Sequence, residues 1–184
     1  MRTSSPRNRA PFLRRPVLFT VFLAFLVILT LAGIYPLHVL RIENPRTGEA
    51  FFVRPVRLND TFSLSYKHSV ELCRIWDFYR VGDGYRLLLD ATSFGSSNTG
   101  LPALLGKGET LTREKNGYRI SNMRRELPYV DFWVHAAYEN TLEFAGESVN
   151  LPLLAGNALL RLSIQKTALF AFVGEKFQNI IHNE

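Results

Sequence analysis

The hydrophobic pattern divides the chain into an apolar N-terminal segment and a longer region of alternating residues. Residues 17–35 form a run of nineteen without a charged side chain, and five arginines precede it. At the rise of an α-helix, this run is long enough to cross a hydrocarbon core of ~30 Å. The first acidic residue is Glu43, and basic flanks are retained in the cytoplasm. The pattern therefore predicts a basic cytoplasmic tail over residues 1–15, a transmembrane helix over 16–36 and an extracytoplasmic domain over 37–184.

A cleaved signal peptide is the alternative for this segment, because it also has a basic start and an apolar centre. The run is longer than the ~7–15 residues that such a peptide uses. Residues 32–36 also lack a small-x-small cleavage site. The sequence therefore favours an uncleaved signal anchor.

Residues 37–184 consist of short segments with the period-two alternation of β-strands. Phe62, Leu64 and Tyr66, for example, share one face of their segment, and polar residues take the other. Hairpin turns are predicted at residues 44–48, at 82–84 and at the type I′ pair Asn116-Gly117. The predicted strands are residues 39–43, 50–53, 61–68, 70–81, 85–92, 110–114, 118–122, 129–136, 141–144 and 158–165.

A series of short strands without a long helical pattern between them predicts an all-β fold, either an antiparallel β-sandwich or a barrel-like domain. The end of the chain differs, because apolar residues between positions 169 and 181 recur at helical spacing. They predict a short C-terminal helix that either caps an open end of the sheet or lies on the membrane.

Charge and cysteine content narrow the possible functions. Five of the 22 Lys and Arg residues precede the apolar run, which leaves 17 against 16 acidic residues in the rest of the chain. A nearly neutral outer domain gives no basis for a nucleic-acid interface, which needs a concentrated basic face. Cys73 is the single cysteine, so an intrachain disulfide is excluded. Its apolar surroundings are typical of a small core residue.

The densest polar cluster lies where two predicted strands meet, in the sequence Tyr66-Lys67-His68-Ser69-Val70-Glu71. His68 has the parity of inward-facing residues and suits either a hydrogen-bonded structural histidine or a ligand-binding one. A catalytic pair of His68 with Ser69 is disfavoured, because neighbouring strand residues point to opposite faces. The chain contains no HxH, HExxH or CxxC pattern, so we predict no metal site and no cofactor.

A second distinctive stretch is the glycine-rich segment of residues 93–108. A loop of this length in a compact domain is usually functional. Glycines let backbone N–H groups converge on an anion or approach a partner closely. The alternative is a long crossover between distant strands.

Four motifs in and around the two stretches form a recognisable series: Tyr66-Lys67-His68-Ser69-Val70-Glu71, Trp76-Asp77-Phe78, Ser93-Phe94-Gly95 and Thr99-Gly100-Leu101-Pro102. With these motifs the chain resembles a bacterial family, domain-of-unknown-function family 1850, over roughly residues 38–165. The chain departs from the family pattern in two places: the glycine loop is expanded at residues 95–100, and Asp77 stands where glutamate is frequent. Genes of this family commonly lie beside TAXI-type tripartite (TRAP) transporters, so the resemblance implies an accessory role in organic-acid import.

We therefore expect a non-enzymatic accessory or ligand-binding module of a TAXI/TRAP-type transporter, anchored in the bacterial inner membrane. Its N-terminus would be cytoplasmic and its outer domain periplasmic or extracellular. The expected partners are the permease subunit of the transporter or its soluble binding protein. The expected ligand- or partner-binding residues are Tyr66, His68, Ser69, Glu71, Asp77, Ser93, Gly95, Gly100, Leu101 and Pro102.

Two other functions fit the same residues. One is a small anchored hydrolase that uses His68 with Ser69 or Glu71, and the other is a structural envelope domain. A closed pocket of converging polar groups would favour the hydrolase, whereas an open apolar groove beside the glycine loop would favour the docking module.

Overall fold

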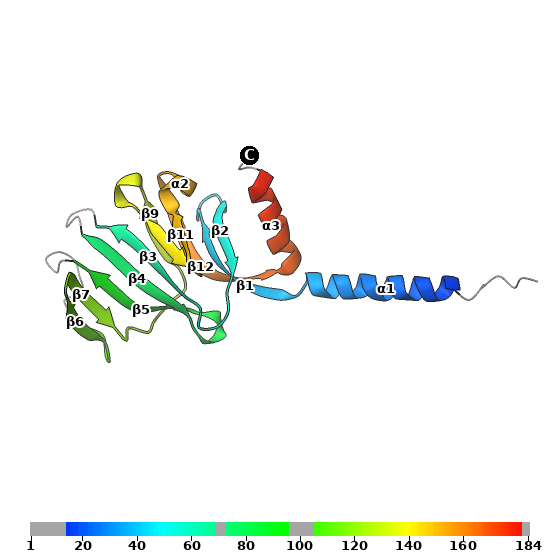
Figure 1. Cartoon of the computed structure of the whole chain (residues 1–184), viewed down its shortest axis with the longest axis horizontal. Coiled ribbons are helices and arrows are strands. Elements are labelled where there is room, and N and C mark those ends of the chain that lie inside the picture. Colours follow the sequence, from blue (N-terminus) through cyan, green and yellow to red (C-terminus); the bar gives the residue numbers. More distant parts are fainter. Residues whose placement is uncertain (1–13, 69–72, 96–104, 182–184) are drawn as a thin grey trace, which may run out of the picture. The chain divides into compact units, whose positions relative to one another are not determined.

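The computed structural model describes residues 14–68, 73–95 and 105–181, with side chains described over 17–68, 73–95 and 105–175 (Figure 1). The chain forms two units. The helical unit comprises Met1–Pro36 and Ala168–Glu184, and the β unit comprises Leu37–Thr167. The helical unit contains α1 (Arg14–Gly33) and α3 (Leu169–Ile181). The predicted C-terminal helix is therefore confirmed, with the expected bounds.

The β unit consists of two sheets (Figure 1). The first has four strands, in the order β2 (Ala50–Pro55), β1 (Pro36–Glu43), β12 (Ala158–Ala168) and β9 (Val130–Val134). The second has eight strands. Seven follow the order β11 (Glu147–Asn150), β10 (Thr141–Phe144), β3 (Thr61–Lys67), β4 (Arg74–Val81), β5 (Leu87–Phe94), β7 (Gly117–Ser121) and β6 (Thr110–Glu114), and β8 (Arg125–Leu127) pairs with β5.

The two sheets pack face to face around one main core. Leu40 on β1 and Leu162 on β12 meet Leu64 on β3 and Leu142 on β10, and all four side chains are buried. The strand alternation causes this arrangement, because it places every second side chain between the sheets. A smaller cluster around Ile120 lies at the β4–β5–β7 part of the second sheet. The mostly antiparallel, sandwich-like fold that the sequence predicted is confirmed.

Each predicted strand overlaps an observed one, although residues 69–72 of the fourth lie outside the described part of the chain. The sequence patterns missed β8 and β11. They also missed the short helices η1 (Asp83–Tyr85), η2 (Ala136–Tyr138) and α2 (Leu151–Ala155). These elements have between three and five residues, which is too short for a period to show.

The predicted hairpin between residues 110–114 and 118–122 is confirmed, but its turn is not of type I′. Glu114 pairs with Gly117, so the loop of this hairpin is Lys115 and Asn116, and neither has a positive φ. Gly117 instead lies in β7, with φ 148°. The β10–β11 hairpin contains a two-residue turn with both φ angles positive, Ala145 at 51° and Gly146 at 81°, as a type I′ turn requires.

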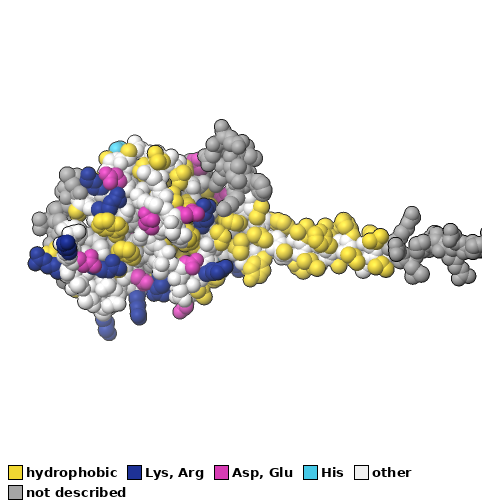
Figure 2. Space-filling view, viewed as in Figure 1, with side chains coloured by type: hydrophobic (Ala, Val, Ile, Leu, Met, Phe, Trp, Pro, Cys, Tyr) yellow, Lys and Arg dark blue, Asp and Glu magenta, His cyan; other side chains and the backbone are white. Residues whose placement is uncertain are grey.

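Helix α1 exposes apolar side chains on its whole visible face (Figure 2). Four of its residues are each at least 60 % exposed, namely Val17, Phe19, Phe22 and Ile28. Within the described residues, no helix reaches the combination of length and hydropathy by which a membrane-crossing helix is identified.

Candidate functional site

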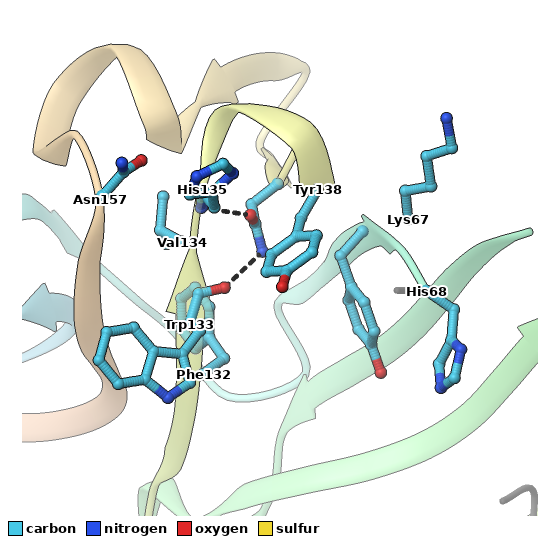
Figure 3. A pocket seen from close by; sticks show the side chains of 10 residues that line it. Lys67, His68, Phe132, Trp133, Val134, His135, Tyr138 and Asn157 are labelled. Atoms are coloured by element: carbon cyan, nitrogen blue, oxygen red, sulfur yellow. Dashed lines mark hydrogen bonds between the residues drawn. The ribbon is translucent and has the colours of Figure 1, made fainter. Parts of the chain in front are cut away.

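A cavity of about 580 Å³ opens in the β unit between the end of β3 and the segment formed by β9 and η2 (Figure 3). Its walls combine aromatic rings with a few basic and amide side chains. The described lining residues are Tyr66, Lys67, His68, Phe132, Trp133, Val134, His135, Tyr138, Asn140 and Asn157. This size and composition are typical of small-molecule sites.

Strand β3 supplies one wall of the cavity. Tyr66 pairs with Ile75 of β4 and belongs to the inward-facing series of Phe62 and Leu64. Burial raises the pKa of the Tyr66 phenol well above its usual value, and the nearby Asp77 carboxyl raises it further. The phenol therefore stays protonated at physiological pH and can donate a hydrogen bond to a ligand.

Strand β9 and η2 supply the opposite wall. Val134 points into the core, and the chain then turns at His135, whose Nδ1 accepts the N–H of Ala137 at 3.0 Å. Because Nδ1 is an acceptor there, Nε2 is the ring nitrogen that can donate. Asn140 follows η2 in the same turn and is buried, with only 2 % of its surface exposed.

The Asn140 amide holds the turn between β9 and β10 in place. Its Nδ2 donates to the Trp133 carbonyl oxygen at 3.1 Å, and its Oδ1 accepts the His135 N–H at 3.3 Å. Figure 3 shows both bonds as dashed lines. Asn140 is thus a structural residue of the cavity wall, and it holds the backbone at His135.

Lys67 is the only charged side chain among the described lining residues of the cavity, and His68 and His135 add imidazole rings. Lys67 and His68 both line it, and Figure 3 shows their side chains extending from the chain in opposite directions. None of the described lining residues is acidic. Among the described residues, no three His, Cys, Asp or Glu side chains lie close enough together to hold a metal ion. The walls suit an anion with an apolar body.

Asp77 lies on the inner face of the second sheet, in the row of Leu64 and Thr92, but it does not line the cavity. Its Oδ1 accepts a hydrogen bond from the Thr92 hydroxyl at 2.6 Å. Burial raises the pKa of the Asp77 carboxyl, and this hydrogen bond offsets part of that rise. Asp77, which the sequence predicted as a site residue, therefore lies near Tyr66 but does not line the cavity.

Replacement of Asp77 by asparagine should stabilise the protein at neutral pH. The folded-state pKa lies above the unfolded value, so folding binds a proton and the Asp77 contribution to stability falls as pH rises between the two values. Asp77→Asn keeps an acceptor for the Thr92 hydroxyl and removes this pH-dependent loss of stability. Urea unfolding at pH 4 and pH 7 should show the gain only at pH 7.

Asp131→Asn provides a control of opposite sign. Hydrogen bonds from Arg161 lower the pKa of the Asp131 carboxyl, so its contribution is present at neutral pH and is lost as the pH falls. This variant should be destabilised at pH 7. If Asp77→Asn instead lost stability at pH 7, the inference that the buried Asp77 carboxylate destabilises the folded protein would be wrong.

Ser93 lies on the opposite face of the second sheet from Asp77. Its hydroxyl accepts a hydrogen bond from Arg119 Nη1 at 3.2 Å, and the Arg119 guanidinium stacks over the Phe78 ring at 4.3 Å. The sheet therefore separates Ser93 from the cavity. The prediction that Ser93 and Tyr66 share one site is not supported by this geometry.

The two motif loops leave the sheet at the same end. Lys67 pairs with Arg74, and Phe94 pairs with Ile75 on the same strand. The His68 N–H donates to the Cys73 carbonyl at 2.8 Å. A β-carbon built on Gly95 would lie 3.1 Å from Cys73 Cβ, so the loop ends are in contact. Of the predicted site residues, Ser69, Glu71, Gly100, Leu101 and Pro102 lie outside the described residues.

Comparison with known proteins gives one family. Residues 62–151 match the family model of DUF1850, a domain of unknown function. No curated protein and no solved structure matches the chain significantly. The DUF1850 segment is shorter than the region over which the motifs resemble that family. It contains β9 and nearly the whole second sheet, and it omits β1, β2 and β12.

The DUF1850 segment supplies every described residue of the cavity except Asn157. Sequence reasoning found the β3 wall through its polar cluster but missed Phe132, Tyr138 and Asn140 on the other wall. The sequence pattern placed Phe132 in a predicted strand over residues 129–136. The pattern gave no sign that β9 lies across from β3, because the two strands belong to different sheets and their proximity depends on how the sheets pack.

Proposed function

We propose that this protein is a non-enzymatic binding module that takes up a small organic acid in the cavity of its β unit. The observation that supports the proposal is the lining of the cavity. Tyr66, Phe132 and Tyr138 offer apolar ring surface, whereas Lys67 and His135 offer donors, and no described lining residue is acidic. A carboxylate gains charge-assisted hydrogen bonds from such donors.

We further propose that α1 anchors the module in the bacterial inner membrane, with the basic tail in the cytoplasm. The uncharged run of residues 17–35 and its arginine-rich flank support this topology. The exposed apolar side chains of α1 support it as well (Figure 2), because water is an unfavourable environment for a helix that is apolar on all sides.

The proposed role is that of an accessory to a TAXI/TRAP-type organic-acid transporter, with the permease subunit or its soluble binding protein as partner. The resemblance to family 1850 supports this role, and a cavity suited to organic acids agrees with it. The β unit carries acidic and basic side chains interspersed on its visible face (Figure 2). A mixed surface of this kind favours short-range recognition over long-range steering of charged solutes.

Binding should depend on the charge of the ligand and on Lys67. We expect the detergent-solubilised full chain to bind phenylacetate and to bind the uncharged phenylacetamide more weakly, as measured by isothermal titration calorimetry. Lys67→Met keeps the aliphatic stem but removes the ammonium group. Because a hydrogen bond to a charged group contributes ~1.5–3 kcal/mol, the affinity for phenylacetate should fall by about tenfold or more.

Lys115→Met is the matched control, since Lys115 is exposed in the β6–β7 turn and does not line the cavity. It should bind phenylacetate as the unchanged protein does. Equal affinity for the acid and the amide would refute the anion preference, and the absence of binding to any of a panel of carboxylates would refute the binding module. In cells, only the Lys67 variant should lower organic-acid uptake.

A further inference from the structure

Helix α3 has an apolar side and a polar side. At 100° per residue, Leu169, Phe170, Val173, Phe177, Ile180 and Ile181 fall within one third of its circumference. The other side carries Ala171, Gly174, Glu175, Gln178 and Asn179, together with Phe172, and Lys176 borders the apolar side. Phe170 is 54 % exposed and Val173 is 39 % exposed. Within the described residues, this apolar side is therefore only partly covered.

The start of α3 is joined to the end of α1. The Leu169 N–H donates to the Tyr35 carbonyl oxygen at 3.2 Å. The Phe170 ring lies directly against the backbone of Gly33, where a built β-carbon would be 1.6 Å from Phe170 Cε2. The Tyr35 N–H itself bonds to the Ala32 carbonyl at 3.2 Å, so α3 begins where α1 ends.

We propose that α3 lies in the membrane interface, with its apolar side in the lipid and its first turn fixed by Phe170 on Gly33. This inference rests on the proposed anchoring of α1. If α1 spans the membrane, its C-terminal end reaches the interface, and the hydrogen bond to Tyr35 brings α3 to the same depth. Short amphipathic helices with Phe and Leu on one face bind at that depth.

The charge of α3 indicates which lipids it prefers. Glu175 and Lys176 are its only charged residues, so the helix carries no net charge. Attraction to anionic headgroups therefore contributes little, and the association depends on buried apolar area. Vesicles of zwitterionic phosphatidylcholine are accordingly the appropriate probe.

Site-directed spin labelling of the full chain in phosphatidylcholine vesicles tests the proposal. Cys73→Ser removes the single cysteine, and labels are then placed one at a time at residues 173 and 177 on the apolar side, 171 and 178 on the polar side, and 23 in α1. Labels at 173 and 177 should be several-fold more accessible to oxygen than to a water-soluble nickel complex. Labels at 171 and 178 should show the reverse.

The label at residue 23 separates the two proposals. If it contacts lipid while all four α3 labels contact water, the inference about α3 fails and the anchor stands. If the label at 23 also contacts water, the anchor itself fails. An oxygen preference at 171 and 178 equal to that at 173 and 177 would also overturn the interfacial orientation.

A pair of glycine variants tests the contact that fixes α3. Gly33→Ala places a methyl group in the position of the Phe170 ring, whereas Gly174→Ala on α3 meets nothing within 4 Å. The distance distribution between labels at residues 23 and 173 should broaden only in Gly33→Ala. An unchanged distribution in that variant would show that Phe170 on Gly33 does not fix the helix.

Discussion

Residues 62–151 should fail to fold when they are produced alone, whereas residues 37–167 should fold. The shorter segment lacks β1, β2 and β12, and with them Leu40, Ile42, Leu160 and Leu162, which are all 0 % exposed. Burial of such a side chain contributes ~1.5–3 kcal/mol. The loss of four is comparable with the whole net stability of a domain, ~5–15 kcal/mol.

The longer segment contains both clusters of buried residues in full. It should unfold in one cooperative transition in urea and give dispersed amide resonances, whereas residues 62–151 should show neither property. A cooperative transition in the shorter segment would mean that the second sheet is stable without the first. The family-matched region would then be an autonomous domain.

Gly117→Ala should destabilise the β unit by about 3 kcal/mol or more. A β-carbon at this position would lie 2.1 Å from the Phe94 carbonyl oxygen and 2.8 Å from Gly95 Cα. Both contacts are to backbone atoms, which cannot move aside as a side chain end can. The φ angle of 148° is also one that residues with a side chain rarely adopt.

Gly146→Ala separates these two causes. Gly146 also has a positive φ, 81°, but a β-carbon there meets nothing within 4 Å. Its replacement should therefore cost only the backbone term of ~1–2 kcal/mol. Chemical denaturation of both variants gives the comparison, and equal losses would show that the approach of β7 to Phe94 is not tight.

Local patterns predicted most of the strands because each strand carries its own alternation. Phe62, Leu64 and Tyr66 face inward as their parity required. The hairpin of β6 and β7 was predicted, but the type of its turn was not, because the composition of Asn116-Gly117 suits a type I′ turn, while the close approach of β7 to β5 requires glycine at position 117 for another reason. That reason involves a distant strand, which local sequence does not reveal.

The candidate site was predictable only in part, for the same reason. The polar cluster at residues 66–68 and the shared end of the two motif loops follow from consecutive hairpins. The wall formed by Phe132, His135 and Tyr138 depends on packing between the sheets and on the Asn140 amide. Period-two parity alone also cannot assign Ser93 and Asp77 to opposite faces, since it does not say which face of each strand is covered.

The β unit has two covalent connections to the helical unit, and they run through neighbouring strands. Strand β1 begins at Pro36, directly after the end of α1, and its neighbour β12 ends at Ala168, directly before α3. A protease that cuts the chain near Pro36 would leave the β unit joined to α3. The Leu169 amide and the Phe170 ring would still hold α3 to Tyr35 and Gly33. Release of the β unit from both helices of the helical unit would therefore require two cuts.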